Sequence, residues 1–314
     1  MASPVTCSAS DGWQTSPLWL PFEIRQPGGS GWAARLTEVP GCAPVWHRER
    51  VSTETPRRSA TPPAAVRQLA VSRSVCLVWE NEHALTFEVG DGPDRCFVKW
   101  APAGSPLDLA AEAARMTWAV AYTPVPRVLG HGADGEGSWL VTAPLPGHNA
   151  VSPRWLADPR TAVIAIGAGL RAMHDALPAA DCPFSWMAAD RIAAAQRAAA
   201  AGRLDTSDWA PEHRELGVEG VLAQVQDIPP TGKLVVCHGD ACAPNTLITD
   251  DGRWSGHVDL GDLGVADRWA DLAIATWSTG WNYGPGWEQL LLDAYGIKPD
   301  AEPIRYYRLL WELG

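Results

Sequence analysis

The sequence KLVVCHGDACAPNTLITDDGRWSGHVDLGDLGVADRWADLA, residues 233–273, decides the fold of this chain. It contains three short apolar runs, at 234–237, 246–249 and 254–258, each of a length that predicts a β-strand. The second and third runs are separated by Asp-Asp-Gly at 250–252, which is a hairpin turn signal. The stretch is therefore expected to form a strand, a polar loop and a β-hairpin.

The hairpin fixes which polar side chains meet. Gly252 lies midway in sequence between Asn245 and Asp259. Pairing the two strands across this turn brings the Asn245 amide and the Asp259 carboxylate together at the open end, and Asp240 lies just upstream of the same end. Two carboxylates and an amide oxygen are hard oxygen ligands that suit Mg²⁺, and a bound cation relieves their repulsion.

Three motifs in this stretch carry a family resemblance. They are His-Gly-Asp-x-x-x-x-Asn at 238–245, Asp-x-Gly at 259–261 and Ala-Asp-Arg-x-x-Asp-Leu-Ala at 266–273. Protein kinases share the Asp, the Asn five residues later and the Asp-x-Gly, but they have Arg where this chain has Gly239. The combination resembles the aminoglycoside phosphotransferase family, and most closely the 3′-phosphotransferases that act on kanamycin and neomycin.

The resemblance implies a fold and a chemistry. The fold is α+β and two-lobed like a protein kinase, with a small antiparallel β lobe that carries one helix and a larger, mainly helical lobe. The cofactors are ATP and Mg²⁺. Asp240 is expected to orient the acceptor hydroxyl and accept its proton, Asn245 and Asp259 to hold the metal, and His238 and Asp271 to support the catalytic loop.

The small lobe offers a candidate phosphate-binding lysine. Lys99 lies inside the apolar run 96–100, and Ser105 is the predicted N-cap of a helix over 107–121 that carries Glu112. A Lys on the third strand and a Glu on the next helix match the kinase ion pair that directs Lys to the α- and β-phosphates. The alternatives are a snorkelling surface Lys and an exposed helix Glu.

Other small-lobe strands are expected at 75–79, 84–89, 125–129 and 138–142. The loop at 80–83, where a kinase fold covers the phosphates, lacks a Gly-rich signature. After the last strand, the backbone of Thr142, Ala143 and Leu145 is expected to bind the adenine. In the large lobe, helices are predicted at 159–177, 187–201, from 211, 287–295 and 303–313, and His174 is interpreted as a packing residue.

The acceptor side matches the resembled family less completely. Asp205, Asp208, Asp262, Trp311 and Glu312 are the predicted substrate-binding residues. The 3′-enzymes commonly have Arg where this chain has Asp262, and two family acidic positions are Ala and Pro at 210–211. An aminoglycoside, a small hydroxylated cation, is the expected acceptor, with its 3′-hydroxyl favoured.

The composition fits a globular enzyme of one two-lobed domain or two modest ones. The chain has 314 residues, 46% of them hydrophobic, and a formal net charge of -11. That charge argues against a nucleic-acid partner, because phosphate backbones need clustered Lys and Arg. No apolar run is long enough to span a membrane and no secretory signal is recognisable. Seven scattered Cys suggest a reducing cytoplasm, and a monomer or homodimer is expected.

The leading residues differ in composition from the rest. Residues 1–65 are rich in Pro, Ser, Thr, Gly and Arg, and they are predicted to be a poorly ordered extension. Residues 66–142 are assigned to the nucleotide-binding lobe, and residues 143–314 to the catalytic and substrate-binding lobe. The sequence leaves open whether the extension docks on the domain, since it contains Trp13, Trp19, Trp32 and Trp46.

Four alternatives stay open at this stage. The chain could be a kinase of another metabolite or antibiotic, such as an amino sugar. It could be a nucleotide-binding module without turnover, although the presence of Asp240, Asn245, Asp259 and Lys99 together argues against this. The polar motif residues could also be strand caps, and Cys237 with Cys242 could suggest zinc, but no second Cys pair stands at the usual spacing.

Overall fold

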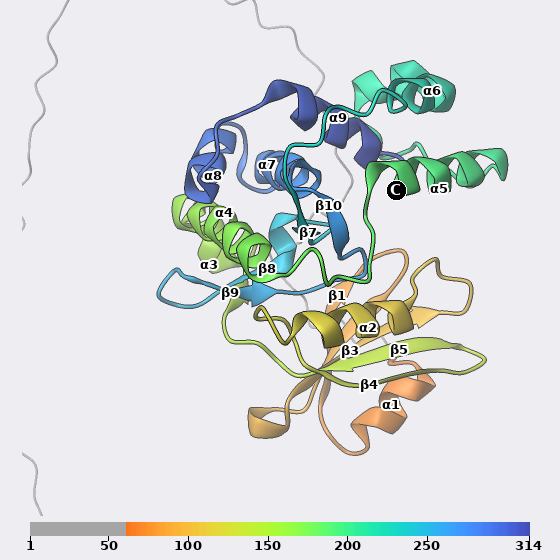
Figure 1. Ribbon diagram of the computed structural model, residues 1–314. Coiled ribbons are helices and arrows are strands. Elements are labelled where there is room, and N and C mark those ends of the chain that lie inside the picture. Colours follow the sequence, from red (N-terminus) through yellow and green to blue (C-terminus); the bar gives the residue numbers. More distant parts are fainter. Residues whose placement is uncertain (1–60) are drawn as a thin grey trace, which may run out of the picture. The chain divides into compact units, whose positions relative to one another are not determined.

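The computed structural model describes residues 61–314, and the four Trp of the leading segment lie outside this range. The chain first forms a five-stranded antiparallel sheet in the order β1-β2-β3-β5-β4 (Figure 1). Its strands are β1 (Val75–Glu80), β2 (Leu85–Val89), β3 (Cys96–Pro102), β4 (Val128–Ala133) and β5 (Gly137–Thr142). The strand expected at 125–129 starts three residues later, because Val125 is buried in the loop that precedes it.

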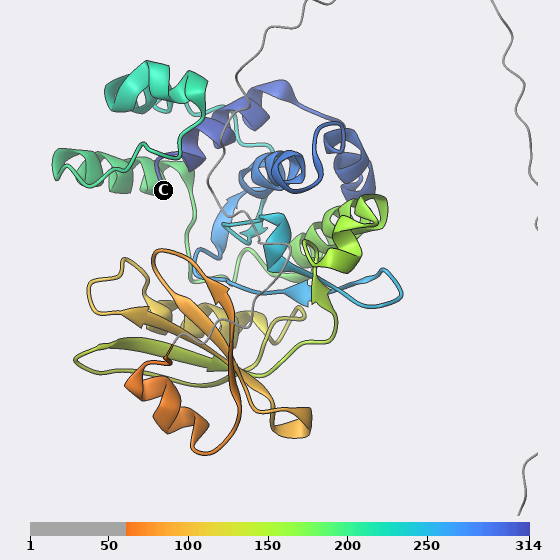
Figure 2. The same cartoon turned by 180° about the vertical axis from the view of Figure 1, so that it is seen from behind.

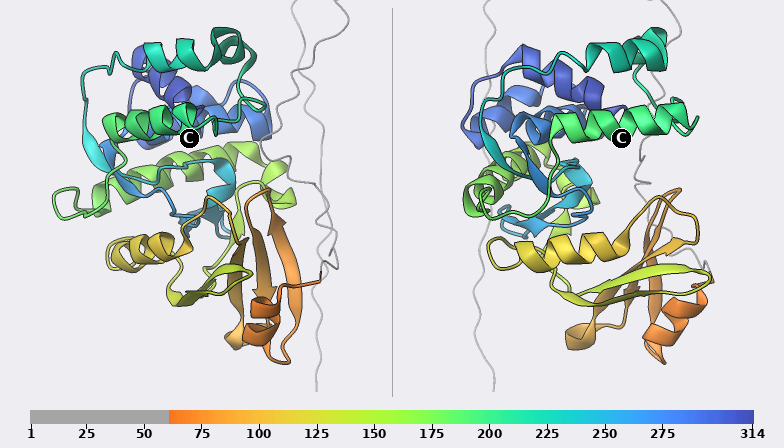
Figure 3. Two further views of the ribbon diagram at one scale, coloured as in Figure 1. Left: turned by 90° about the vertical axis from the view of Figure 1, so that its right-hand side faces the viewer. Right: turned by 45° about the vertical axis from the view of Figure 1, so that its right-hand side comes forward.

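Two helices cover this sheet where one was expected. Helix α1 (Ala64–Ala70) buries Val66 and Ala70 in a cluster with Phe87 and Val98. Helix α2 (Leu109–Ala119) packs on the other face, between the sheet and the helical lobe (Figure 3). The folded lobe thus begins at or before Ala64, which places the end of the predicted extension inside a helix.

The start of α2 corrects the predicted cap. Asp108 is the N-cap, and its carboxylate accepts a hydrogen bond from Ala111 N at 2.9 Å. Ser105 instead donates its hydroxyl to the carbonyl of His83 at 3.0 Å. The Ser side chain therefore ties the β1–β2 loop to the segment before α2 instead of capping the helix.

The larger lobe is mainly helical. The helices predicted there are present within one or two residues at the ends that were given. The helices are α3 (Pro153–Leu156), α4 (Pro159–Ala176), α5 (Ala188–Ala200), α6 (Pro211–Gln224), α7 (Trp269–Tyr283), α8 (Glu288–Tyr295) and α9 (Ala301–Trp311). Helix α7 was not predicted, yet it is central, since it packs against α4, α8 and α9. Helices α5 and α6 lie side by side next to α9 (Figure 2).

Short strands carry the motif stretch through this lobe. Strand β7 (Leu234–Cys237) pairs with β10 (Gly264–Asp267), and β8 (Thr246–Ile248) lies between β6 (His148–Asn149) and β9 (Trp254–His257). An apolar cluster that includes Met116 of α2, Met173 of α4 and Leu260 joins the two lobes beneath these strands. Among residues 61–314, no helix is long and apolar enough to cross a membrane.

Candidate active site

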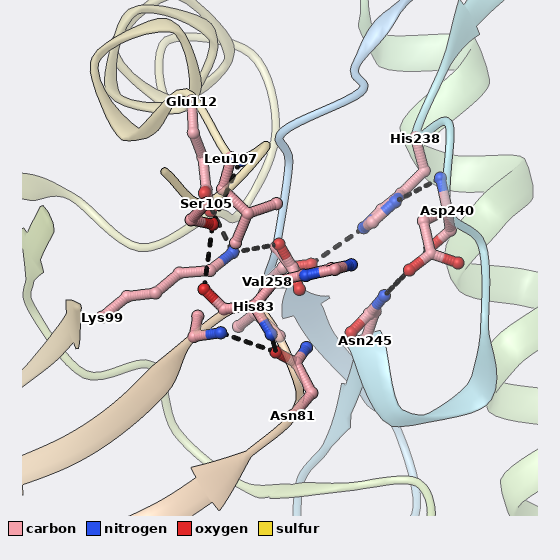
Figure 4. A network of polar contacts seen from close by, with 12 residues as sticks. Asn81, His83, Lys99, Ser105, Leu107, Glu112, His238, Asp240, Asn245 and Val258 are labelled. Carbon is pink, nitrogen blue, oxygen red and sulfur yellow. Dashed lines mark hydrogen bonds and ion pairs between the residues drawn. The ribbon is translucent and has the colours of Figure 1, made fainter. Parts of the chain in front are cut away.

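The hairpin places Asn245 opposite Val258, the residue before Asp259. Thr246 pairs with His257 in the β8–β9 ladder, and Val258 N donates to the Asn245 carbonyl at 3.0 Å. The Asn245 side-chain amide donates to both the backbone carbonyl and the carboxylate Oδ2 of Asp240, each at 3.0 Å (Figure 4). Because the amide NH₂ is engaged in this way, its oxygen is turned away from Asp240.

The catalytic loop is held by one buried carboxylate on α7. Asp271 Oδ2 accepts from His238 N at 2.6 Å and from His174 Nε2 at 2.9 Å, and Asp271 Oδ1 accepts from Gly239 N at 3.0 Å. Burial alone would raise the pKa of Asp271, but His174 and the loop N–H groups lower it. Asp271 therefore remains an ionised acceptor for the loop, and His174 is the packing residue that pairs with it.

The two residues before Asp240 shape the loop in different ways. His238 Nε2 lies 2.9 Å from the Val258 carbonyl, and its Nδ1 accepts from Asp240 N at 3.3 Å, so the bonds assign the proton to Nε2 (Figure 4). Gly239 has φ +91°, and a Cβ there would lie 2.4 Å from the Asp262 carbonyl oxygen. Only glycine satisfies both conditions, which explains why no Arg follows the His here.

Lys99 joins the two lobes across the site. Its Nζ lies 3.0 Å from Glu112 Oε2 on α2 and 2.5 Å from Asp259 Oδ1 (Figure 4). Burial would lower the pKa of Lys99, but the charges of Asp259 and Glu112 raise it. Burial raises the pKa of Glu112 despite Lys99. The pair predicted from the sequence is thus in contact, with Asp259 as a third member.

Asp259 has an unusual backbone. Its φ is +63°, and Val71 is the one other described residue besides glycine with a positive φ. Such a conformation costs about 1–3 kcal/mol and is typically found at functional sites. Although desolvation opposes it, Lys99 lowers the pKa of Asp259. The strained backbone therefore presents an ionised carboxylate toward the gap between the lobes.

The donors at this point fit a divalent cation. The Asp259 carboxylate and the Asn245 amide oxygen are oxygen donors of the type that Mg²⁺ prefers. Beside them, the second carboxylate oxygen of Asp240, Oδ1, is buried without a hydrogen-bond partner. A buried, unpaired carboxylate oxygen is costly unless a ligand completes it. By contrast, His174, Cys237 and Asp271 lie close together, but His174 and Asp271 already bond each other, and burial raises the pKa of the Cys237 thiol.

A compact turn takes the place of a glycine-rich loop between β1 and β2. The Asn81 side-chain oxygen accepts from His83 N at 3.0 Å and from Ala84 N at 2.8 Å (Figure 4). Together with the Ser105 bond to the His83 carbonyl, this fixes the turn below Lys99. Local side-chain bonds provide the shape that glycines provide in protein kinases.

Comparison with known proteins places this geometry in a family. Residues 74–307 match the phosphotransferase enzyme family. The chain belongs to that family. An aminoglycoside 3′-phosphotransferase of Streptomyces fradiae is 39% identical over 223 residues, which cover 68% of this chain and 82% of that protein.

Solved structures agree with this assignment. The structure of an aminoglycoside-3′-phosphotransferase of type VIII is 32% identical, with a TM-score of 0.69 over 80% of this chain and 97% of that one. The structure of APH(3″)-Id from Streptomyces rimosus in complex with ADP and streptomycin is 27% identical, with a TM-score of 0.65 over 80% and 97%. The predicted kinase-like fold and family resemblance are confirmed.

The segment that follows β5, residues 142–145, limits which backbone groups of this phosphotransferase can bind the adenine. Ala143 N already donates to the Arg127 carbonyl at 2.9 Å, so its N–H is not available to a nucleotide. Residue 144 is Pro and has no N–H. Within residues 61–314, Leu145 N donates to no backbone carbonyl. The Leu145 N–H is therefore the donor that this connector can offer, with Thr142 held in β5.

The predicted acceptor-side residues of the phosphotransferase fall into different environments. Asp205 and Asp208 are exposed in the loop before α6, and Asp205 Oδ1 accepts from Ser207 N at 2.8 Å. Asp262 is also exposed, yet the surrounding protein partly desolvates its carboxyl and raises its pKa, and Asp240 adds to this shift. These three remain candidates for contact with a cationic ligand.

Glu312 differs from its expected role. Its side chain is 2% exposed, and Oε1 accepts from Ala210 N at 2.8 Å and from His213 Nδ1 at 2.9 Å. The carboxylate therefore links the end of α9 to the start of α6 instead of facing a substrate. The sequence does not reveal this contact, because Ala210 and Glu312 are about a hundred residues apart in the chain and meet only in the folded structure.

Residues of α7 and α5 that the sequence analysis did not select also hold the phosphotransferase site. Ser278 Oγ accepts from Ala243 N at 2.9 Å, so a second side chain of α7, two turns after Asp271, also holds the catalytic loop. Arg191 is buried on α5 and donates to the carbonyls of Leu310 and Gly314. An Arg on the buried stripe of an Ala-rich helix was a signal that could have indicated its role.

Proposed function

We propose that the chain transfers the γ-phosphoryl group of ATP to a hydroxyl of an aminoglycoside, with the 3′-hydroxyl favoured. The observation that carries this proposal is the state of Asp240, whose Oδ2 is held by Asn245 while Oδ1 is buried and unpaired. A carboxylate with one oxygen held and the other still without a hydrogen-bond partner suits a group that binds and orients a hydroxyl.

In the proposed reaction, the acceptor oxygen forms a bond to the γ-phosphorus as the bond to the β–γ bridging oxygen breaks. ADP leaves, and the acceptor proton passes to Asp240. Phosphoryl transfer has a loose transition state, so positioning contributes more than base strength. The bonds from Asn245 and the backbone of the loop supply that positioning.

On the nucleotide side, we assign the phosphates to Lys99 and the adenine to the connector at Leu145. Glu112 and Asp259 hold Lys99 extended into the gap between the lobes. Asn245 and Asp259 would hold Mg²⁺, which when bound neutralises the phosphate charge. The relative from Streptomyces rimosus was solved with ADP, which supports nucleotide binding here.

On the acceptor side, two observations support a hydroxylated cation. The chain has a formal net charge of -11, and Asp205, Asp208 and Asp262 are exposed. The 3′-phosphotransferase of Streptomyces fradiae is 39% identical. We further propose a reducing, cytoplasmic location, since Cys76, Cys96, Cys182 and Cys237 are free thiols.

The test is product analysis with matched acceptors. The purified full chain is incubated with ATP and Mg²⁺ and with kanamycin B or its 3′-deoxy form, tobramycin. Stoichiometric ADP formation and a singly phosphorylated product are expected with kanamycin B, and no such product with tobramycin. Phosphorylation of both compounds would exclude the 3′-hydroxyl. If neither they nor streptomycin stimulated turnover while another hydroxylated metabolite did, the aminoglycoside assignment would be wrong.

A further inference from the structure

The catalytic loop and the segment after Asp-x-Gly are in direct contact at Gly239 and Asp262. An ideal Cβ built on Gly239 would lie 2.5 Å from the Asp262 Cβ and 2.4 Å from the Asp262 carbonyl oxygen. Asp240 is the next residue after Gly239, and consecutive Cα atoms are about 3.8 Å apart. The side chain of Asp262 therefore begins close to Asp240, whose Oδ1 is buried without a hydrogen-bond partner.

The carboxyl groups of Asp240, Asp259 and Asp262 influence one another. Desolvation by the surrounding protein raises the pKa of Asp262, and of the neighbouring charges Asp240 raises it most, with a further contribution from Asp259. Like charges act in this way only over short distances. A cation that reaches Asp262 would therefore relieve repulsion at the place where we assign the acceptor hydroxyl.

The protein itself does not neutralise Asp262. Within the described part of the chain, its carboxylate makes no hydrogen bond and no ion pair. Arg191 and Arg115 lower its pKa, but Arg191 donates to two backbone carbonyls at the end of the chain, and Arg115 Nε donates to the Leu263 carbonyl at 3.0 Å. Asp262 is thus an exposed carboxylate that can still accept hydrogen bonds from a ligand.

The closeness of the two acids limits the shape of a ligand that binds both. A carboxylate binds an ammonium group through charge-assisted hydrogen bonds of about 2.7–2.9 Å, and it binds a hydroxyl over a similar distance. Because Asp262 contacts the residue before Asp240, the ammonium must lie close to the reacting hydroxyl. Groups on neighbouring ring carbons meet this condition, whereas an ammonium across the ring does not.

We propose that Asp262 binds an ammonium group on the ring carbon next to the reacting hydroxyl, so that the acceptor is a vicinal amino alcohol. This inference rests on the proposed function and specifies it. On an aminoglycoside that is phosphorylated at the 3′-hydroxyl, the group bound by Asp262 is the 2′-amine. Asp262 is a specificity residue in this role, because it holds the acceptor while Asp240 receives the proton.

The first test uses three acceptors that differ by single amino groups. Kanamycin B has amines at 2′ and 6′, kanamycin A has a hydroxyl in place of the 2′-amine, and kanamycin C has a hydroxyl in place of the 6′-amine. For the wild-type full chain, the KM for kanamycin A should exceed that for kanamycin B about fivefold, equal to about 1 kcal/mol, the upper range for an exposed ion pair. Kanamycin C should stay within about twofold of kanamycin B. Equal KM values for kanamycins A and B, or a larger loss with kanamycin C, would overturn the proposal.

Substitutions at position 262 test whether this carboxylate causes the preference. Asp262→Asn should raise the KM for kanamycin B to the value for kanamycin A, and Asp262→Glu should keep part of the difference. Asp262→Arg should favour kanamycin A, because a guanidinium repels the 2′-ammonium. Added salt should reduce the wild-type preference. A preference for kanamycin B that survives in Asp262→Asn would place the ammonium elsewhere. If the variants fold poorly, the wild-type comparison still decides.

Asp251→Asn is the control with the same change of charge. Asp251 lies exposed on the turn of the β8–β9 hairpin, at the end opposite Asn245. Its replacement should leave the ratio of the KM values for kanamycins A and B as it is in the wild type. An equal loss of preference in Asp251→Asn would show that net charge, and not the position of Asp262, sets the ratio.

Calorimetry separates acceptor binding from metal binding. MgATP should bind Asp262→Asn as tightly as the wild type, and a weaker affinity for MgATP would make Asp262 a metal ligand and overturn the proposal. The failure of the inference also differs from the failure of the proposed function. If none of the three kanamycins is phosphorylated, the proposed function fails. If all three are phosphorylated with equal KM values, the function stands and the role of Asp262 is wrong.

Discussion

The catalytic loop and the proposed acceptor wall, which includes Asp205, Asp208 and Trp311, are built in opposite ways. In the loop, Asp271 is fully buried and receives bonds from His174 and from two backbone N–H groups. In the wall, Asp205 and Asp208 are exposed, and Trp311 at the end of α9 is half-buried. A substitution in the loop would break buried hydrogen bonds, whereas a substitution at an exposed position of the wall would break none.

This difference indicates which positions of the enzyme tolerate substitution. Replacing a buried, fully bonded carboxylate leaves partners unsatisfied, which costs folding free energy. Replacing an exposed or half-buried side chain changes what a ligand meets but leaves the fold in place. Phosphoryl transfer is therefore expected to be insensitive to changes in the wall, and the choice of acceptor insensitive to the details of the loop.

The largest effect is expected at Asp240. Asp240→Asn keeps the side-chain volume but removes the carboxylate, and turnover should fall roughly 10²-fold or more while MgATP still binds. The measurement is steady-state ADP release together with calorimetric titration of the nucleotide. Asp251→Asn is the control, since Asp251 lies exposed on the hairpin turn. Rates near those of the unaltered protein would remove Asp240 from the proposed role.

The next largest effect is structural, at Asp271. Asp271→Asn places an NH₂ group among N–H donors and leaves His174 without its anionic partner, so unfolding free energy should fall by about 3 kcal/mol or more. Urea unfolding followed by fluorescence measures this loss. A change below 1 kcal/mol, on the scale of surface substitutions, would mean that the loop does not depend on this carboxylate.

A smaller effect is expected in the acceptor wall. The double variant of Asp205→Asn and Asp208→Asn removes two exposed charges, each worth about 0.2–1 kcal/mol in an ion pair. The acceptor KM should rise by about two- to tenfold, most at low salt, with stability unchanged. An acceptor KM that does not respond to either substitution would show that these acids lie outside the acceptor site.

The smallest effect is expected at an exposed ion pair on the surface of α4. Arg171 lowers the pKa of Asp175 chiefly through a hydrogen bond across one turn of α4. A lowered folded-state pKa stabilises the protein above the unfolded pKa, and this contribution is lost as the pH falls through the folded value. Asp175→Asn should cost about 0.3–0.5 kcal/mol at neutral pH and nothing in acid. A cost that persists in acid would point to packing instead.

The sequence by itself determined the chemistry of this protein. The hairpin that turns at Gly252 places Asn245 opposite Val258, next to Asp259, because strand pairing across a turn is a local rule. The Lys99–Glu112 contact could be predicted in the same way, from a strand and the helix that follows it. These features could be predicted because they involve residues that are close in the sequence or that have the spacing of a known motif.

Only the tertiary structure decided the contacts around the proposed acceptor wall. Glu312 was predicted from the sequence to bind substrate, but its carboxylate accepts hydrogen bonds from Ala210 N and His213. Trp277 and Trp281 carried no motif, and their pairing with Trp311 requires α7 and α9 to pack together. The physical reason is that these contacts join segments far apart in the chain, so no local pattern of polarity or spacing specifies which faces meet.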